Sequence, residues 1–407
     1  MESPVDVAVF APGLLAGGGA EKTALSVAAA LSDLGLSVVC FTDRPVDPGW
    51  IHEHFGLDVP DVHFAVLPPT VRGRFRAPRA VLDLWDDLRM QRAVRKVRPR
   101  LFVNVKFKSS LPGVGTANWY FTHFPHVLEV SPRSAPHSVY LRLIARARRQ
   151  LLHPRHRSFI DTYDLVTANS GFTGEKVAER WGVVAETLYP PCDLATGTDS
   201  ARRRDRIILA VGRFQGRGEG VPHKNQHVMI DAFSEMEDLI AGGWELHLVG
   251  AAHGDEAQAY LNEVRTRADG LPVVIHPNAS QHELADLQRR ASLYWHAQGY
   301  DTDVRTRPEA QEHFGISTVE AMAAGAIPLV YATAGPQEIV APVNPDWTWT
   351  TLAELRLMTR SLAAATDTAS SRAACARRAA DFGEGAFREH VRDVWKRLCA
   401  APVRETS

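Results

Sequence analysis

Two glutamates, Glu312 and Glu320, mark the ends of the segment EHFGISTVE and could form a working pair. Eight positions are a little over two helical turns, which leaves two side chains about 80° apart around a helix. The HFG sequence and the β-branched STV after it predict that the helix begins only after Phe314. Glu312 then lies in a loop and Glu320 in the first helical turns. One carboxylate could bind the hydroxyls of a sugar and the other those of a ribose. A loop charge and a helix-surface charge are the alternative, but the small residues after Glu320 indicate close packing.

Two cations flank a glycine-rich stretch in VGRFQGRGEGVPHKNQ. Arg213 directly follows an apolar run, and Lys224 directly precedes a helical pattern. Ligands of open α/β sheets bind beyond the carboxyl ends of the strands. A planar guanidinium and a point-charge ammonium at that place could neutralise a diphosphate. Two surface cations are the alternative, and His223 could share the role of the lysine.

A third candidate is the glycine loop from Gly17 to Glu21, between an apolar run and an alanine-rich helical pattern. Glycines let the backbone approach a ligand, and the free N–H groups and dipole of a helix N-terminus attract a phosphate. The spacing is not GxGxxG, so a dinucleotide site is not favoured. A tight turn is an equally good interpretation of the loop alone.

Two weaker patterns remain. His123 and His126 in WYFTHFPH could position or deprotonate a hydroxyl, although a structural histidine is the commoner case. Asp301-Thr302-Asp303 could hold a divalent cation, but no second carboxylate cluster accompanies it, and we expect a loop.

The elements that would position these residues alternate between short apolar runs and helical patterns, which predicts an α/β fold with parallel sheets. One series ends near YPPCD and a second begins at DRIILAVGRF, with a polar linker between them. We therefore expect an N-terminal domain over 1–195 and a second domain over 196–380. The tail from about 351 is rich in alanine and arginine, which predicts helices. Its last part, 381–407, is expected to be a C-terminal helix outside the second domain.

Composition narrows the partners. The net charge of the 407-residue chain is −1, yet residues 71–158 contain 19 Lys and Arg against 4 Asp and Glu. Such a segment is a solvated face or a site for an anionic membrane, a phosphorylated acceptor or nucleic acid.

The four cysteines are scattered, which favours reduced thiols in the cytosol. No signal peptide or run of about 20 apolar residues is visible, so membrane contact is expected to be peripheral. The excess of arginine over lysine suggests a GC-rich bacterial genome.

The motifs GGAE, VTANSGFT, YPPCD, VGRF followed by a lysine, and EHFGISTVEAMAAG occur in this order over most of the chain. Together they resemble the retaining glycosyltransferases of GT-B architecture, family 4. YWHAQGY and KNQ are similar to mannosyltransferase-like members that use GDP-mannose. The resemblance implies two Rossmann-like β/α/β domains with the active site in the cleft between them. The N-terminal domain would bind the acceptor, the second would bind the nucleotide sugar, and the helix in 381–407 would pack back on the first.

The resemblance also implies roles for the residues at matching positions. Catalytic roles fall on Glu312 at the donor sugar, His123 at the sugar and acceptor, and Arg213 and Lys224 at the diphosphate. Donor-binding roles fall on Gly18, Gly19, Arg213, Lys224, Gly315, Ile316, Ser317, Thr318 and, at the ribose, Glu320. The long insertion before Lys224 departs from the family pattern and puts the position of this residue in question.

The implied activity is retaining transfer of a hexose, best matched by mannose from GDP-mannose, without a metal or a bound cofactor. The oxocarbenium character of the sugar and the negative charge of the leaving diphosphate would develop together. The acceptor would be a lipid-linked sugar or a small molecule, and nucleic acid is not an expected partner. Transfer from a UDP-sugar to a soluble small molecule and a non-catalytic nucleotide-sugar-binding subunit remain alternatives. A phosphorylase is disfavoured because no lysine stands in a pyridoxal-phosphate context. We expect a cytoplasmic protein, peripheral at the inner face of the membrane.

Overall fold

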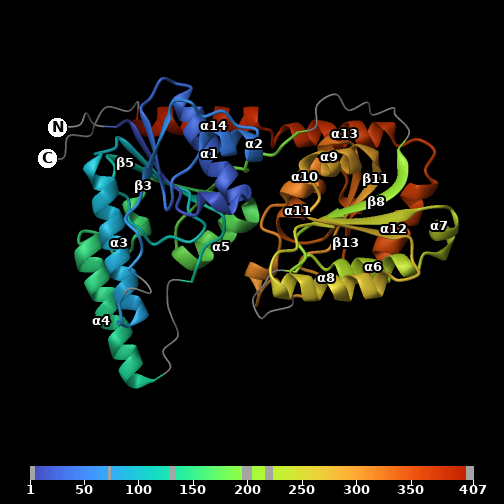
Figure 1. Cartoon of the computed structure of the whole chain (residues 1–407), viewed down its shortest axis with the longest axis horizontal. Coiled ribbons are helices and arrows are strands. Elements are labelled where there is room, and N and C mark those ends of the chain that lie inside the picture. The colour runs from blue at the N-terminus through green and yellow to red at the C-terminus, as the bar shows by residue number, and fades with distance from the viewer. Residues whose placement is uncertain (1–4, 72–74, 128–133, 195–203, 216–222, 400–407) are drawn as a thin grey trace. The chain divides into compact units, whose positions relative to one another are not determined.

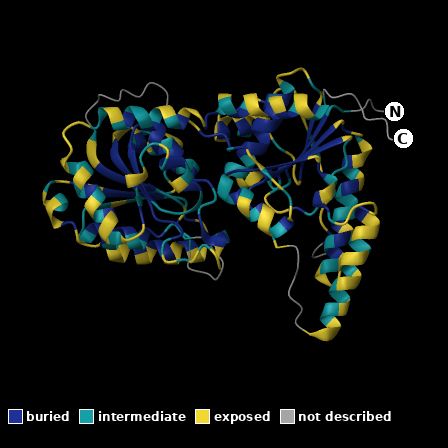
Figure 2. Ribbon diagram, turned by 180° about the vertical axis from the view of Figure 1, so that it is seen from behind, coloured by how far each residue is buried: buried dark blue, intermediate teal, exposed yellow. Residues whose placement is uncertain are grey.

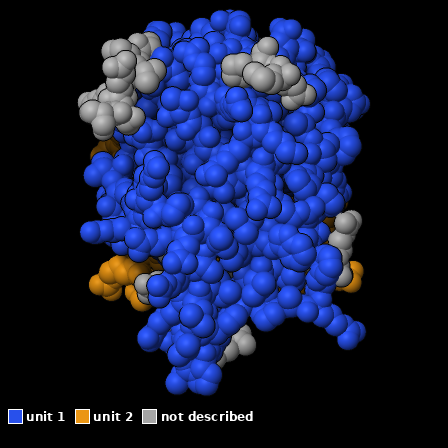
Figure 3. All heavy atoms as spheres, turned by 90° about the vertical axis from the view of Figure 1, so that its left-hand side faces the viewer, with its two compact units in different colours: residues 1–191, 384–407 blue, residues 192–383 orange. Residues whose placement is uncertain are grey.

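The computed structural model describes residues 5–71, 75–127, 134–194, 204–215 and 223–399. Most of the expected linker and the insertion before Lys224 lie outside these residues. The chain divides into two compact units, which Figure 3 colours separately. Unit 1 comprises residues 1–191 and 384–407, and unit 2 comprises 192–383. The sequence-based boundaries were 195/196 and 380/381.

Unit 1 is a parallel sheet of seven strands covered by helices on both faces (Figure 1). The strand order is β3-β2-β1-β4-β5-β6-β7. The strands are β1 (Val7–Phe10), β2 (Val38–Thr42), β3 (Val62–Val66), β4 (Leu101–Asn104), β5 (Ala117–Thr122), β6 (Leu165–Ala168) and β7 (Glu186–Thr187). The helices are α1 (Gly19–Ser32), α2 (Pro48–Phe55), α3 (Arg79–Lys96), α4 (Ala135–Leu152), α5 (Gly171–Trp181) and α14 (Glu384–Cys399), with short turns at η1 (Leu14–Ala16) and η2 (Ile160–Thr162).

Unit 2 has the same layered plan around six parallel strands in the order β10-β9-β8-β11-β12-β13. The strands are β8 (Asp205–Val211), β9 (Glu245–Gly250), β10 (Val273–Pro277), β11 (Ala291–His296), β12 (Ile327–Tyr331) and β13 (Thr348–Trp349). The helices are α6 (Gln226–Ser234), α7 (Glu237–Ala241), α8 (Asp255–Ala268), α9 (Gln281–Arg290), α10 (Ile316–Ala323), α11 (Ala334–Val340), α12 (Leu352–Ala364) and α13 (Ala369–Ala380), with η3 (Pro308–Ala310) and η4 (Pro345–Trp347).

The apolar strands explain both sheets. A parallel strand is buried on both faces, so it needs a nearly continuous apolar run. In β1, Val7 and Val9 pack into one core and Ala8 and Phe10 into another on the opposite face. Figure 2 shows the strands buried and the outer helix faces exposed. The predicted parallel α/β fold is therefore confirmed in each unit.

Helix α14 returns to unit 1 and packs beside α1. Its apolar side chains Phe387, Val391 and Val394, at helical spacing, enter the core around β1. The Ser26 hydroxyl donates to Glu384 over 2.8 Å at the start of α14. The last helix therefore belongs to the N-terminal unit, although it follows unit 2 in sequence.

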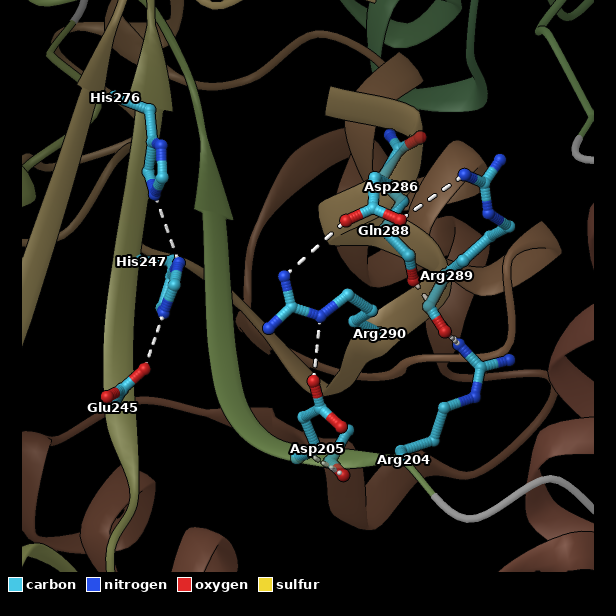
Figure 4. Close-up of polar contacts among 10 residues, drawn as sticks. Arg204, Asp205, Glu245, His247, His276, Asp286, Gln288, Arg289 and Arg290 are labelled. Carbon is cyan, nitrogen blue, oxygen red and sulfur yellow. Dashed lines mark hydrogen bonds and ion pairs between the residues drawn. The ribbon is translucent and has the colours of Figure 1, made fainter. Parts of the chain in front are cut away.

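A series of polar contacts joins β9, β10 and α9 in unit 2, and Figure 4 shows its part from Glu245 through His247 to His276. Glu245 contacts His247 over 3.0 Å, His247 contacts His276 over 3.1 Å, and His276 contacts Glu283 over 2.9 Å. Burial lowers the pKa of His247, and this outweighs the opposing effect of Glu245. These contacts fasten the edge strand β10 to β9 and to α9.

Candidate functional site

Glu312 and Lys224, two of the candidate residues, contact each other in unit 2. The Lys224 ammonium forms an ion pair with Glu312 Oε2, and His296 Nε2 lies 3.5 Å from the same oxygen. The side chains of Lys224 and Glu312 are 21% and 19% exposed. Lys224 lies in the loop between β8 and α6, His296 is the last residue of β11, and Glu312 lies in the loop between η3 and α10. One strand end and two loops beyond the carboxyl ends of strands therefore supply the cluster.

A residue of α11 holds the backbone at Glu312 in place. The Gly335 N–H donates to the Glu312 carbonyl over 3.1 Å. A Cβ on Gly335 would lie only 2.3 Å from Phe314 Cα, so this close approach requires glycine. The helix α10 begins at Ile316 with Gly315 as its N-cap at φ 114°. The predicted start of this helix after Phe314, with Glu312 in the preceding loop, is confirmed.

Lys224 is positioned by its own neighbours. Its aliphatic stem covers Gly212, where an added Cβ would lie 2.5 Å from Lys224 Cγ. Asn225 adopts a left-handed conformation at φ 55° and donates to the Ala297 carbonyl over 2.8 Å. The Gln226 amide donates to the Gly212 carbonyl over 2.9 Å. The KNQ sequence therefore supplies one charged residue and two residues that fix its place.

Charge and burial set the protonation of the cluster. Burial opposes ionisation of Glu312, but the charge of Lys224 and the contact with His296 outweigh it and hold the pKa of this carboxyl far below its ordinary value. Burial lowers the pKa of His296 despite the nearby carboxylate, and it lowers the pKa of His313 to about 4. At neutral pH the site therefore holds an ionised glutamate and neutral imidazoles.

The N-terminus of α10 supplies the polar groups beside this cluster. The Tyr294 hydroxyl lies 2.8 Å from Ser317 Oγ, and Thr318 Oγ1 is buried without a hydrogen-bond partner among the described residues. Burial raises the pKa of Tyr294, with smaller contributions from the charges of both Glu312 and Glu320. Both carboxylates therefore lie near the ring of one buried tyrosine. Free N–H groups and the helix dipole make such an end suitable for a phosphate.

Arg213 lies outside these contacts. It is exposed, and its guanidinium forms no hydrogen bond or ion pair with another described residue. Its carbonyl accepts from the Gln226 side chain over 3.2 Å, which fixes the backbone after β8. The structure thus joins Lys224 to Glu312 and leaves Arg213 at the surface of unit 2.

The glycine loop of unit 1 is a capped helix start. The Gly18 N–H donates to Glu21 Oε2 over 2.9 Å, and α1 begins at Gly19. Gly17 has φ 68°, and its carbonyl lies 3.1 Å from His54 Nε2. An added Cβ on Gly17 would lie 2.5 Å from that ring, so Gly17 is the position that requires glycine. A phosphate at this loop would compete with the Glu21 carboxylate for the Gly18 N–H.

A cavity of about 260 Å³ adjoins the glycine loop at the carboxyl ends of β1 and β4. Lys106, Phe107 and Lys108 line it together with Glu21. His123 lies next to this wall, because its Nε2 donates to the Val105 carbonyl over 3.1 Å and its ring stacks on Phe107. Unit 1 therefore gathers His123, two lysines and the glycine loop.

The DxD triplet is a loop, as expected. Asp301 has φ 60°, and Asp303 accepts a hydrogen bond from the Arg305 N–H over 2.9 Å. Among the described residues there is no group of three or more His, Cys, Asp and Glu side chains that could hold a metal ion.

Sequence reasoning missed His296, Lys106 and Lys108. His296 ends the apolar run SLYWHA, and only its position at the end of a strand distinguishes it from a core residue. The two lysines follow β4 in VKFKSS, where a search for residues beyond strand ends would have found them.

Comparisons with known proteins agree with the two-unit organisation. Residues 17–196 match the family described as Glycosyltransferase Family 4, and residues 199–347 match Glycosyl transferases group 1. The alpha-1,3/1,6-mannosyltransferase alg-2 of Neurospora crassa is 24% identical over 394 residues, covering 81% of this chain and 76% of the relative. A GDP-Man:Man(3)GlcNAc(2)-PP-Dol alpha-1,2-mannosyltransferase of Mus musculus is 27% identical over 195 residues. That match covers 44% of this chain and 36% of the relative, so it spans about a third of the relative's length.

Solved structures share the fold. A glycosyltransferase from Rickettsia africae covers 100% of both chains at a TM-score of 0.65 and 14% identity. Anabaena Alr3699/HepE, solved in complex with UDP and glucose, has a TM-score of 0.61 and 16% identity, covering 97% of this chain and 100% of its own. The chain belongs to the glycosyltransferases of GT-B architecture, with a family 4 domain followed by a group 1 domain.

Proposed function

We propose that this chain is a retaining glycosyltransferase that moves mannose from GDP-mannose to an acceptor hydroxyl in glycan biosynthesis. The observation that carries the proposal is the Lys224–Glu312 pair, which stands directly before the N-terminus of α10 in the group 1 domain. The choice of mannose is supported by the names of both mannosyltransferase relatives, and that of guanine by the GDP-Man donor in the name of the mouse relative.

The pair and the helix end suit the two halves of a nucleotide sugar. The donor's anomeric C–O bond breaks, the nucleotide diphosphate leaves with the bonding electrons, and the acceptor oxygen bonds to the anomeric carbon. Lys224, Arg213 and the N–H groups at Ile316 to Thr318 would stabilise the negative charge that develops on the diphosphate. Glu320 would bind the ribose, and Gly18 and Gly19 would approach the diphosphate from unit 1.

The ionisation of Glu312 limits its role. A carboxyl whose pKa lies far below neutrality accepts hydrogen bonds and has no proton to give. Glu312 therefore suits the hydroxyls of the donor sugar and does not suit general acid catalysis. The acceptor proton would then pass to an oxygen of the leaving phosphate on the same face of the sugar, with His123 orienting the sugar or the acceptor. This same-face attack is the retaining outcome.

Unit 1 would receive the acceptor, with Lys106 and Lys108 next to it. We favour an acceptor sugar that is linked to a lipid through phosphate, because the mouse relative is named for a PP-Dol substrate. The protein would act at the cytoplasmic face of the membrane of a bacterial cell, without a metal. Among its described helices, none is long and apolar enough to cross a bilayer.

The test combines binding with turnover. Melting of the full chain with GDP, UDP, ADP and dTDP, each with and without magnesium, should show a shift with GDP that magnesium leaves unchanged. GDP-mannose should then release GDP when a membrane extract supplies the acceptor. Glu312→Gln should abolish this release and keep the fold, whereas the matched control Asp303→Asn should keep both the release and the fold.

Each other outcome has a distinct meaning. A shift and turnover with UDP would replace the donor and favour a UDP-sugar-dependent enzyme with a soluble acceptor. Binding without turnover of any nucleotide sugar would favour a non-catalytic subunit. Full activity of Glu312→Gln would refute the role given to the pair.

A further inference from the structure

Helix α4 has a composition unlike the other helices of unit 1. It pairs with α3 through an Asp87–Arg148 ion pair and through Gln91, which donates to the Leu152 carbonyl over 2.9 Å. Figures 1 and 2 show the two helices side by side, with the N-terminal half of α4 extending away from the sheet of unit 1. Only Leu152 among its 18 residues is buried. Most of α4 is therefore surface.

Large apolar side chains occupy that surface. Val139, Leu143 and Leu151 are 55%, 62% and 55% exposed. Val139 and Leu143 are four residues apart, so they lie one above the other on the same side of the helix. A helix of a globular protein normally turns such side chains toward the core. On α4 they face away from it.

Arginines share this side of the helix. Arg146 follows Val139 by seven residues, which places it within about 20° of the valine around the helix axis. Arg142 and Arg149 lie on the flank of the same face, and the helix contains no aspartate or glutamate. Asp87 neutralises Arg148, whereas these three outer arginines form no ion pair with another described residue.

The C-terminal end of α4 adds a basic hollow. A cavity of about 780 Å³ is lined by Arg146, Arg149 and Arg157 together with Ser110 and Ser158. Guanidinium groups and hydroxyls are the donors that recognise phosphate oxygens. Arg146 and Arg149 line the hollow and also lie on or beside the helix face that carries Val139 and Leu143. The hollow and the apolar side chains are therefore neighbours along one helix.

We propose that the outer face of α4 docks on an anionic phospholipid surface, with Val139 and Leu143 entering the acyl boundary and the arginines binding headgroup phosphates. Exposed apolar side chains flanked by basic ones, with no acidic residue, are the pattern of a helix that lies in the membrane interface. This inference rests on the proposed function, because the surface would bring unit 1 to a lipid-linked acceptor. An acidic protein would satisfy the arginines but would not require the exposed aliphatic pair.

Co-sedimentation of the full chain with vesicles tests the surface. Binding is expected with vesicles that mix phosphatidylcholine and phosphatidylglycerol, to fall as salt is raised, and to be absent with phosphatidylcholine alone. Replacing Arg142, Arg146 and Arg149 with glutamine should weaken binding by on the order of 100-fold, about five-fold for each charge. Val139→Ser with Leu143→Ser should weaken it about ten-fold or more.

The matched control removes three charges from exposed positions of the neighbouring helix, with Arg92, Arg95 and Lys96 changed to glutamine. This variant should keep most of the binding. Equal losses in the control and α4 variants would overturn the proposal in favour of the general basic field of unit 1. Binding that ignores phosphatidylglycerol, or that survives the serine pair unchanged, would overturn it as well.

Nucleotide binding separates this inference from the proposed function. Every α4 variant should keep the thermal shift with GDP, because the altered side chains lie on unit 1 and are exposed. Vesicle binding through α4 without any GDP shift would refute the donor assignment and leave the surface standing. A GDP shift and turnover with no vesicle binding would refute the surface alone.

Discussion

Replacing Lys224 with methionine should destabilise unit 2, because it leaves the Glu312 carboxylate partly buried without its counterion. Methionine keeps a long flexible stem over Gly212, so the main loss is the charge. Exposed ion pairs contribute about 0–1 kcal/mol, whereas removing one partner of a buried pair costs about 3–5 kcal/mol. Both side chains are about one-fifth exposed, so we expect a loss between these limits, about 2–3 kcal/mol.

The free energy needed to protonate Glu312 sets an upper limit on the stability that Lys224→Met can lose. From its ordinary value of 4.5, neutralising the carboxyl at pH 7 costs about 3.5 kcal/mol, at about 1.4 kcal/mol per pKa unit. Without Lys224, burial becomes the dominant effect and raises the pKa of Glu312. The defect of Lys224→Met should therefore be larger in neutral buffer and shrink as the pH falls toward that raised pKa.

A double-mutant cycle isolates the pair. Glu312→Gln alone should cost about 1 kcal/mol, since a lysine can extend its ammonium into water. The double variant should recover most of the loss, giving a coupling energy of about 2 kcal/mol. Urea unfolding gives the free energies, and hydrogen exchange in β11 and β12 locates the change in unit 2. A Lys224→Met protein within 0.5 kcal/mol of the parent, or a double variant whose losses simply add, would refute a coupled pair.

Two further predictions concern the frame of the site. Gly335→Ala should destabilise unit 2 by about 3 kcal/mol or more, since the new methyl would lie 2.3 Å from Phe314 Cα. Gly385→Ala in α14, where nothing lies within 4 Å, should change the urea midpoint little, and equal midpoints for the two variants would contradict the packing argument. Acid should also weaken the fold: His313 has a pKa of about 4, below its unfolded value of about 6.5, so its contribution is complete above 6.5 and is lost as the pH falls toward 4. At pH 5 the loss should reach about 2 kcal/mol by urea unfolding, and a His313→Gln protein that keeps the full pH dependence would exclude this histidine as the cause.

The sequence was informative where local rules decide the structure. The start of α10 followed from the glycine and β-branched residues after Glu312, and the parallel sheets followed from the buried apolar runs. The helix α3 has no clear signal in the sequence, because it is rich in charge and has no broad apolar face. The strand β3 likewise has a weak signal, because it is only partly buried and its sequence, VHFAV, lacks a clear alternation.

Long-range contacts were beyond sequence reasoning. Lys224 and Glu312 are 88 positions apart, and no local pattern indicates that one neutralises the other. Both were expected at a donor site for separate reasons, one as a phosphate ligand and one as a sugar ligand. The ion pair arises because β8 lies beside β11 and parallel to it in the sheet. The loops that follow these two strands therefore meet at the carboxyl edge of the sheet. Arg213 had an expected role at the diphosphate as well, but its side chain remains exposed in unit 2.

The pairing changes what the lysine can do before a donor arrives. An ammonium held by Glu312 keeps that carboxylate ionised and oriented, and the carboxylate in turn keeps the charge of Lys224 near the N-terminus of α10. A bound diphosphate would compete with Glu312 for the ammonium of Lys224. A sugar hydroxyl would then take the place of the ammonium at Glu312, so the carboxylate would keep a hydrogen-bond partner. Donor phosphate and donor sugar would then each satisfy one half of the broken pair. A free nucleoside diphosphate supplies only the first half, so in the proposed enzyme it should bind more weakly than its sugar conjugate, and Glu312→Gln should remove that difference.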